Sequence, residues 1–256
     1  MYYSQFTDVW LDGIGLQSLD PSIVVVDVQE KVPKTEVESH NLPTSEGLLV
    51  TKNRRVSLSV VVQFAIIEQN IRRREDVLQK VRSWASQGKY LKMTHKEEKR
   101  LRVYVDSLPT LSSVNKYTGT LSVTFIAYYP PYWELDCVDK LTLSGSSGNG
   151  SFYIRGDDLN VLVDASIKPN GSLSDLTLKV GRSSITLTGF SVNQEVTFSH
   201  VNDRWLAIKA GDVDLLPYRT PDSSDDLITS SGCRTDVSFS ANCNVSITVS
   251  ARGLWM

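Results

Sequence analysis

The sequence predicts a mainly β protein, in which an α+β domain with one helix precedes an all-β sandwich of jelly-roll type. In the first half, long alternating strands surround a single segment with helical periodicity. In the second half, short alternating runs recur at intervals of about 8–12 residues, as in a sandwich or jelly roll. Between the halves, the run Tyr129-Pro130-Pro131-Tyr132-Trp133 must end a strand, because neither proline has an N–H to donate. We therefore expect domains at residues 1–135 and 136–256.

The first strands follow from β-branched content and alternation. Residues 23–28 consist of valine and isoleucine apart from one aspartate, which favours a strand. The polar stretch 29–47 contains Pro33 and Pro43 and predicts a long loop or an irregular hairpin. Residues 56–66 alternate almost without fault, so their apolar side chains share one face of a long strand.

One helix follows these strands. Its apolar residues form a single stripe at helical spacing: Val77, Leu78, Val81, Trp84 and Ala85. Glu75 and Asp76 fall in the first turns, where carboxylates suit the helix dipole, and Gly88 is placed to end the helix. Strands at 101–106 and 117–128 come next, so we expect the helix to cover one sheet face or to plug a small barrel.

The second half begins with a tract of serine, glycine and one asparagine at 144–151, which predicts a flexible connection. The alternating runs beyond it are separated by Gly-, Asn- and Asp-rich turns and predict two stacked antiparallel sheets. Strands are expected at 152–155, 161–167, 176–180, 184–187, 195–199, 205–209, 236–239 and 245–249. The stretch 222–232 has no regular strand signal.

Composition limits the classes of protein that fit. The apolar fraction of 41% and the charged fraction of 22% are those of a soluble globular protein, and a net charge of −2 argues against a general nucleic-acid binder. The N-terminus lacks the basic and apolar regions of a secretory signal, and no apolar run approaches the roughly 20 residues needed to span a bilayer. Cys137, Cys233 and Cys243 are expected to be free thiols, with a Cys233–Cys243 bridge across a hairpin as the alternative.

Enzyme signatures are missing from the sequence. It has no nucleophile elbow, Walker loop, zinc-protease helix or Cys-x-x-Cys pair, and His40, His95 and His200 are scattered in polar, loop-like contexts. We therefore predict no catalytic residues, no metal site and no cofactor. The basic clusters 52–55 and 72–74 suggest phosphate binding, but solvated entries to a strand and a helix, or a subunit contact, fit a near-neutral domain better.

One cluster has the composition of a sugar site. Trp205 follows Asn202, Asp203 and Arg204, and an exposed aromatic ring beside such groups can stack on a pyranose while they hold its hydroxyls. The alternative is a core or rim tryptophan after an ordinary Asn-Asp turn.

The order and lengths of the elements carry a resemblance over essentially the whole chain. Its parts are the polar run 27–47, the strand 56–67, the helix ending Trp84-Ala85-Ser86-Gln87-Gly88, the strand from Tyr117-Thr118-Gly119 to the aromatic–proline ending at 133, and the last strand at 244–250. Together they resemble the distal tail protein family of long-tailed (siphovirus-type) bacteriophages, the hub component of the baseplate.

The resemblance implies a structural protein of the virion without catalysis. In that family the N-terminal domains close into a hexameric ring that continues the tail tube, and galectin-like jelly rolls project outward as anchor points for host adsorption. A ring would also cover the edge of a strand as long as 56–66.

The expected partners are further copies of the chain, possibly as stacked rings, the tail-tube protein, a tail-tip (tail-associated) protein, and receptor-binding or baseplate proteins. DNA would be passing cargo only, and no membrane insertion is expected. The protein is expected to be synthesised and assembled in the host bacterial cytoplasm. In the finished virion it would lie at the distal tail tip, in the baseplate. The alternative function is a carbohydrate-binding β-sandwich module that contributes to recognition of the host surface.

Overall fold

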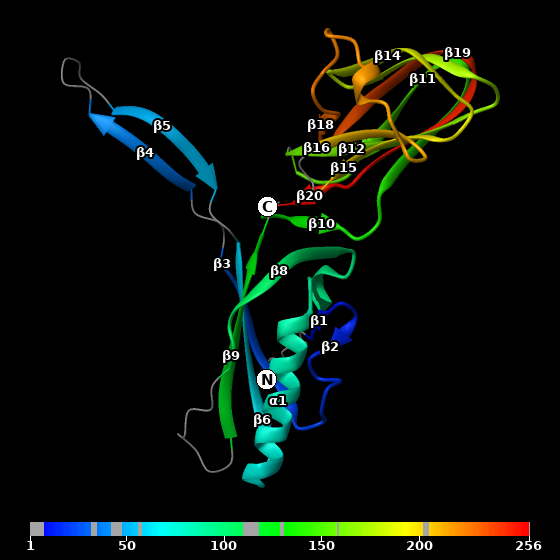
Figure 1. Cartoon of the computed structure of the whole chain (residues 1–256). Helices are drawn as coiled ribbons and strands as arrows, with labels where there is room; N and C mark the ends of the chain where they lie inside the picture. The colour runs from blue at the N-terminus through cyan, green and yellow to red at the C-terminus, as the bar shows by residue number, and fades with distance from the viewer. Residues whose placement is uncertain are drawn as a thin grey trace. The chain divides into compact units, whose positions relative to one another are not determined.

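The computed structural model describes residues 8–31, 35–41, 48–55, 58–109, 118–128, 131–157, 159–201 and 205–255. The chain divides between Trp133 and Glu134 into two compact units, which we call the N-terminal unit and the C-terminal unit. Both are built mainly of strands, and the described residues contain one α-helix, as the sequence predicts (Figure 1). Within these ranges, no helix is long and apolar enough to cross a membrane.

The N-terminal unit is an antiparallel sheet with the strand order β2-β1-β7-β8-β9-β6-β3. Its strands are β1 (Val9–Leu11), β2 (Ile14–Gly15), β3 (Ile23–Lys31), β6 (Ser59–Ile67), β7 (Tyr90–Met93), β8 (Lys99–Ser107) and β9 (Thr118–Ala127), with a 3-10 turn η1 (Thr94–Lys96) after β7. The strands β4 (Thr35–Asn41) and β5 (Leu48–Arg55) form a separate hairpin whose register shifts between Glu38 and Ser39. Within the predicted polar stretch 29–47, residues 29–31 thus end β3 and residues 35–41 form the first strand of an irregular hairpin, while 32–34 and 42–47 lie outside the described residues.

The helix α1 (Ile71–Gln87) covers one face of this sheet, and the side chains of that face are buried (Figure 1). Asn70 caps its first turn by accepting a hydrogen bond from the Arg72 N–H, and the predicted apolar stripe is buried. The ring of Trp84 meets that of Phe125 edge to face at 6.0 Å, and its indole N–H donates to the Ile14 carbonyl at 2.9 Å. The helix therefore joins the central strand β9 to the far end of the sheet.

Gly88 ends the helix for a reason other than the one expected from sequence. Its φ of −82° is open to any residue, so no left-handed cap is present. A Cβ at this position would lie 1.8 Å from Leu11 Cδ2, inside the core. The glycine is therefore required for the close approach of the chain to β1.

The long strand β6 has no exposed edge, which corrects one expectation. Strands β3 and β9 pair with its two sides over almost its whole length, whereas β3 ends the order of paired strands. Among the described residues, the edge of the sheet that a neighbour could extend is therefore that of β3. A bulge between Val25 and Asp27 interrupts this strand, and bulges are one means by which proteins keep exposed edge strands from pairing with other chains.

The C-terminal unit has the strand order β14-β13-β19-β12-β15-β16-β17, with β11 paired to β19 and β18 to β12. Its elements are β11 (Asp139–Ile154), β12 (Asn160–Pro169), β13 (Leu173–Val180), β14 (Ser183–Val192), β15 (Val196–Val201), β16 (Trp205–Ala210), β17 (Val213–Asp214), the 3-10 turn η2 (Leu216–Tyr218), β18 (Ile228–Ser230), β19 (Cys233–Ala251) and β20 (Leu254–Trp255), while β10 (Trp133–Leu135) spans the boundary. No helix occurs among the described residues of this unit, in keeping with the predicted all-β sandwich.

Two long bent strands create the sandwich. β19 pairs with β13 through residues 237–241 and with β12 through 245–251, and β11 follows it with a register shift between Gly145 and Ser147. A Cβ on Gly150 would lie 2.9 Å from Leu143 Cδ2, although seven residues of straight strand span about 23 Å. The β11–β19 pair therefore folds over and contributes to both layers.

The expected flexible connection at 144–151 is wrong. These residues lie inside β11 and pair with β19 on both sides of the bend. A Cβ on Gly148 would lie 2.8 Å from Cε1 of the buried Phe239. Glycine is thus needed at positions 148 and 150, because the folded strand leaves no room there for a larger side chain.

The stretch without strand signal covers the edge strand β14. Backbone N–H groups of Thr220 and Ser224 donate to the carbonyl oxygens of Thr186 and Ser184 at 2.9 and 2.7 Å. In return, the Thr186 N–H donates to the Ser223 hydroxyl at 2.9 Å. An irregular segment thus satisfies edge groups that would otherwise invite pairing with another chain.

The cysteines are free, as expected. A hairpin bridge between Cys233 and Cys243 is excluded because both residues lie on the single strand β19.

Candidate assembly surfaces

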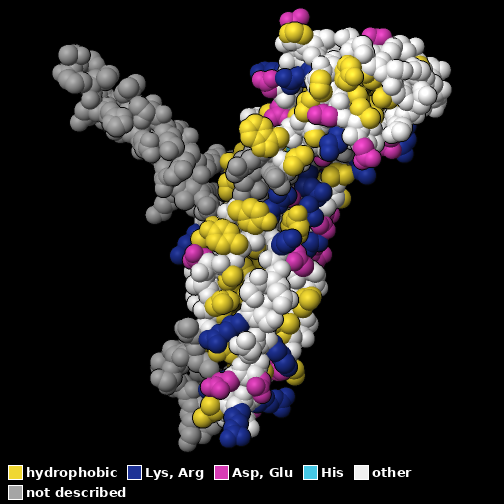
Figure 2. Space-filling view, in the orientation of Figure 1, with side chains coloured by type: hydrophobic (Ala, Val, Ile, Leu, Met, Phe, Trp, Pro, Cys, Tyr) yellow, Lys and Arg dark blue, Asp and Glu magenta, His cyan; other side chains and the backbone are white. Residues whose placement is uncertain are grey.

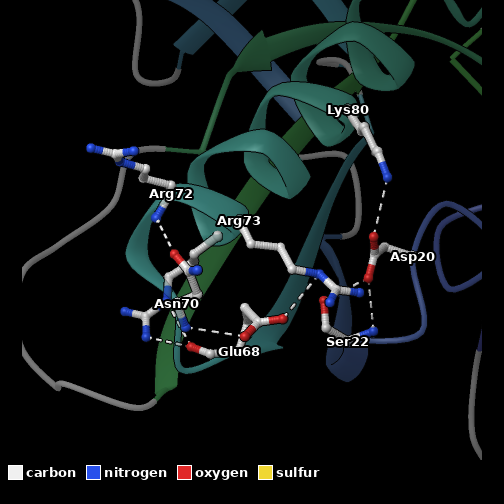
Figure 3. Close-up of polar contacts among 8 residues, drawn as sticks. Asp20, Ser22, Glu68, Asn70, Arg72, Arg73 and Lys80 are labelled. Atoms are coloured by element: carbon white, nitrogen blue, oxygen red, sulfur yellow. Dashed lines mark hydrogen bonds and ion pairs between the residues drawn. The ribbon is translucent and has the colours of Figure 1, made fainter.

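Polar contacts at the start of α1 fasten the helix to the beginning of β3 (Figure 3). Asp20 is almost buried, accepts hydrogen bonds from the Ser22 N–H and hydroxyl at 3.1 and 2.9 Å, and pairs with Lys80 at 3.1 Å. The hydrogen bonds from Ser22, reinforced by Lys80, lower the pKa of Asp20 although burial acts in the opposite direction. This cluster stabilises the fold.

The arginines at 72–74 do not converge on an open anion site. Arg73 pairs with Glu68 at 3.1 Å, as Figure 3 shows, and the buried Arg74 donates to the Glu68 carbonyl from Nε at 3.2 Å and Nη2 at 2.6 Å. In the hairpin, Lys52 and Arg54 stand opposite Glu38 and Glu36 by backbone register. The contacts of Arg73 and Arg74 with Glu68 favour the structural interpretation of the cluster 72–74 over phosphate binding.

Tyrosines and arginines alternate across β7, β8 and the end of β9. The Cζ of Arg100 lies 4.2 Å from the ring centroid of Tyr90, and that of Arg102 lies 5.8 Å from Tyr90 and 5.9 Å from Tyr128. Tyr104 continues the row at 6.4 Å from Tyr128. Figure 2 shows hydrophobic and basic side chains mixed on the exposed surface of this unit. We call these five residues the Tyr–Arg row.

Tyrosine and arginine are the residue types most enriched at binding hot spots. Tyr104 is 49% exposed and Tyr128 39%, so their rings are accessible in the single chain. Arg102 lies over the ring of Tyr128, and Tyr104 contacts Tyr128 in turn, so these contacts restrict the rings before any partner arrives and reduce the entropy cost of docking. The row is therefore the best-prepared contact surface of the N-terminal unit.

On the sheet face opposite α1, the described side chains of the neighbouring strands β6 and β9 carry no charge, whereas β8 beside them adds Arg102 and Tyr104 to the same face. The side chains of β6 that alternate with its buried residues are Ser59, Val61, Gln63, Ala65 and Ile67, and the corresponding described residues of β9 are Ser122, Thr124 and Ile126. All of them are accessible to solvent at least in part. A face of small and uncharged side chains gives a phosphate backbone nothing to bind.

The predicted sugar cluster is only partly described. Trp205 is 73% exposed and faces Val201 across the β15–β16 pair, so it does not belong to the core. Asn202, Asp203 and Arg204 lie outside the described residues. Carbohydrate binding at this cluster stays a prediction.

Other candidate sites offer little chemistry. A shallow polar groove of about 560 Å³ lies over β11, β13 and β19, lined by Asn149, Ser151, Lys179, Asp236 and Ser238 among others. In the described ranges, no three His, Cys, Asp or Glu side chains are grouped so that they could hold a metal ion. These features supply no nucleophile, base and orienting group in one place.

The surroundings of His200, which the sequence predicts to be a polar loop, differ in the structure. It lies on β15, not in a loop, and its side chain is only 3% exposed. Its ring nitrogens meet carboxylate oxygens of Asp164 at 3.1 Å and Asp226 at 2.9 Å. Burial lowers the pKa of His200, but these two hydrogen bonds and charges outweigh it, so the pKa is raised overall.

The folds of the two units define a class of protein, in which an α+β unit precedes a jelly-roll sandwich. The fold matches the crystal structure of the SPP1 Dit protein (gp 19.1) with a TM-score of 0.74, over 96% of this chain and 98% of that chain, at 9% sequence identity. That protein is described as a paradigm of the hub adsorption apparatus in phages that infect Gram-positive bacteria.

A second match is the phage P2 baseplate in its activated conformation with calcium, with a TM-score of 0.48 and 10% identity over 96% of this chain and 97% of that chain. No family model and no curated protein matches the sequence. The resemblance to the distal tail protein family is thus confirmed at the level of the fold.

Proposed function

We propose that this chain is a structural hub protein at the distal end of a phage tail, in the baseplate. Six copies would close through their N-terminal units into a ring that continues the tail tube and lets DNA pass. The observation that carries the proposal is the fold shared with SPP1 Dit over nearly the full length of both chains. Both units take part in that match, so it is the whole architecture that corresponds.

The surfaces of the N-terminal unit suit a ring. The edge of β3 can accept a neighbour, and the Tyr–Arg row offers aromatic and cationic contacts on β7 and β8, which β9 and β6 separate from β3. The uncharged face of β6 and β9 suits the inner wall, because a strongly basic wall would hold DNA through its phosphates. Closed cyclic symmetry leaves no unpaired copy of such surfaces.

The C-terminal unit would then serve as the anchor for adsorption components. Its edge strand β14 is covered by the chain itself, as expected for a sandwich that must stay soluble while it projects from a ring. The partners we propose are the tail-tube protein, a tail-tip protein and receptor-binding or baseplate proteins, with DNA as cargo only. We assign the chain no catalytic role and place it in the virion.

Light scattering and negative-stain microscopy of the purified chain, alone and with tail-tube protein, test the ring. We expect six-fold rings for the wild type, and loss of rings for Tyr128→Ala because truncation of a hot-spot residue costs about 2 kcal/mol or more per contact. Tyr153→Ala, at a still more exposed tyrosine of the C-terminal unit, is the control and should keep the rings. A strictly monomeric wild type under both conditions would contradict the proposal.

The inner wall is tested by adding charge to assembled rings. Thr124→Arg, on the uncharged face, should make rings retain duplex DNA in a salt-dependent manner. Gln79→Arg on the exposed side of α1 adds the same charge elsewhere. Equal retention by both variants would show that the β6–β9 face does not line the channel.

A further inference from the structure

His200 lies where two strands leave a third. β12 pairs with β18 through residues 160–162 and with β15 through 165–167. Between these stretches, Val163 donates its N–H to the Leu227 carbonyl at 2.9 Å, at the end of the irregular segment that leads into β18. His200 follows the last residue of β15 that pairs with β12, Phe198. The side chain therefore occupies the fork between β15 and β18.

The ring bridges the two sides of this fork. One nitrogen meets Asp164 on β12 and the other meets Asp226 on the segment before β18, both within hydrogen-bond distance. Only the imidazolium form has two N–H donors, whereas neutral imidazole turns one lone pair toward a carboxylate oxygen. The geometry thus fits a protonated ring, and one of its two bonds must break when the proton leaves.

We propose that His200 is a proton-dependent clasp, which holds β15 and the segment before β18 together when it is doubly protonated and opens the fork when it is neutral. The proposal concerns the C-terminal unit alone and does not depend on ring formation. Opening of the fork would also affect exposed residues at the end of the β15–β16 pair. His200 pairs with Leu206 in backbone register, and the next pair, Val201 and Trp205, is exposed.

The charged groups around the His200 ring are carboxylates and one arginine that is paired elsewhere, so the imidazolium is the main cation of the clasp. Asp164 comes from β12, and Asp225 and Asp226 come from the irregular segment. Arg219 of the same segment is held by Asp225 at 3.1 Å and by the carbonyl oxygens of Ser224 and Asp225. From β16 the facing residue is Leu206, which has no charge.

The sign of the pH dependence follows. A histidine whose pKa is raised by folding stabilises the fold fully below its ordinary value near 6.5, and this contribution disappears as the pH rises through the folded-state pKa. The fork should therefore be closed at mildly acidic pH and open more often at alkaline pH.

Two measurements on the full chain test the clasp. Histidine NMR, assigned with His200→Gln, should place the titration of His200 above the ordinary value. Hydrogen exchange, expressed as protection relative to intrinsic rates, should fall about tenfold in peptides 199–206 and 219–228 across that titration, equivalent to about 1.4 kcal/mol. Peptides of the N-terminal unit serve as an internal reference.

Variants separate the clasp from general effects. His200→Gln should remove the pH dependence of protection, while His95→Gln, at a histidine on η1, should leave it unchanged. If His200→Gln fails to fold, Asp226→Asn replaces it and should shift the His200 titration to lower pH. A His200 that titrates at or below its ordinary value, or protection that does not change across its titration, would overturn the proposal.

Discussion

The substitution Gly148→Val probes the bend that builds the sandwich. The new Cβ would lie 2.8 Å from Cε1 of Phe239, whereas carbon atoms pack best at about 3.5–4.0 Å. Phe239 is buried and its ring is rigid, so overpacking should cost about 1–3 kcal/mol. Replacing glycine by a β-branched residue in a strand recovers up to about 1 kcal/mol. The expected net loss in the free energy of unfolding is about 1–2 kcal/mol.

Equilibrium urea unfolding measures this loss, and hydrogen exchange of β11 and β19 peptides shows where it arises. Ser144→Val is the matched control, because Ser144 belongs to the same tract and is exposed, so its effect should stay within about 0.5 kcal/mol. Adding Phe239→Leu should relieve the clash, with a coupling energy of about 1 kcal/mol in a double-mutant cycle. If Gly148→Val is as harmless as Ser144→Val, the tract is not packed as described.

Three other substitutions test the N-terminal unit. Trp84→Ala should cost about 3–5 kcal/mol in urea unfolding, and the exposed Trp205→Ala should cost almost nothing; similar losses would refute the packing of α1 on the sheet. Gly88→Ala should destabilise by about 1–3 kcal/mol and be rescued in part by Leu11→Ala, and a neutral effect would contradict the close approach. Because the pKa of Asp20 is lowered in the fold, its contribution is present above about pH 4 and is lost on acidification; Asp20→Asn should flatten acid unfolding curves, and an unchanged curve would refute this assignment.

The elements predictable from sequence are those with a clear period. The stripe containing Val77 and Trp84 marks α1, and the alternation after Leu58 marks β6, because each buries one face only. The short strands β1 and β7 were missed, since three or four residues carry too little periodicity to stand out.

The bent pair of strands β11 and β19 could not be foreseen for a different reason. Serine and glycine have low strand preference, and their role in β11 depends on side chains that lie far away in sequence, such as Phe239. The same holds for Gly88, whose partner Leu11 comes from another strand. Close approach of backbones is a tertiary property that a local pattern does not contain.

The candidate surfaces were hidden from sequence because they depend on register. The Tyr–Arg row draws on three strands, and the His200 clasp joins residues that lie 26 and 36 positions away. The arginines near α1 were visible, but Glu68 holds two of them through contacts that only the structure shows. Trp205 was singled out from sequence, and its exposure keeps it available for a test of sugar binding.

Cryo-electron microscopy of intact tail tips tests the hub proposal most directly. The account predicts six copies around the tail axis at the distal end of the tube, with Gln63 and Thr124 of the uncharged face toward the channel and the C-terminal units outside it. Density for this chain away from the tail axis, or a channel lined by another face of the N-terminal unit, would contradict it.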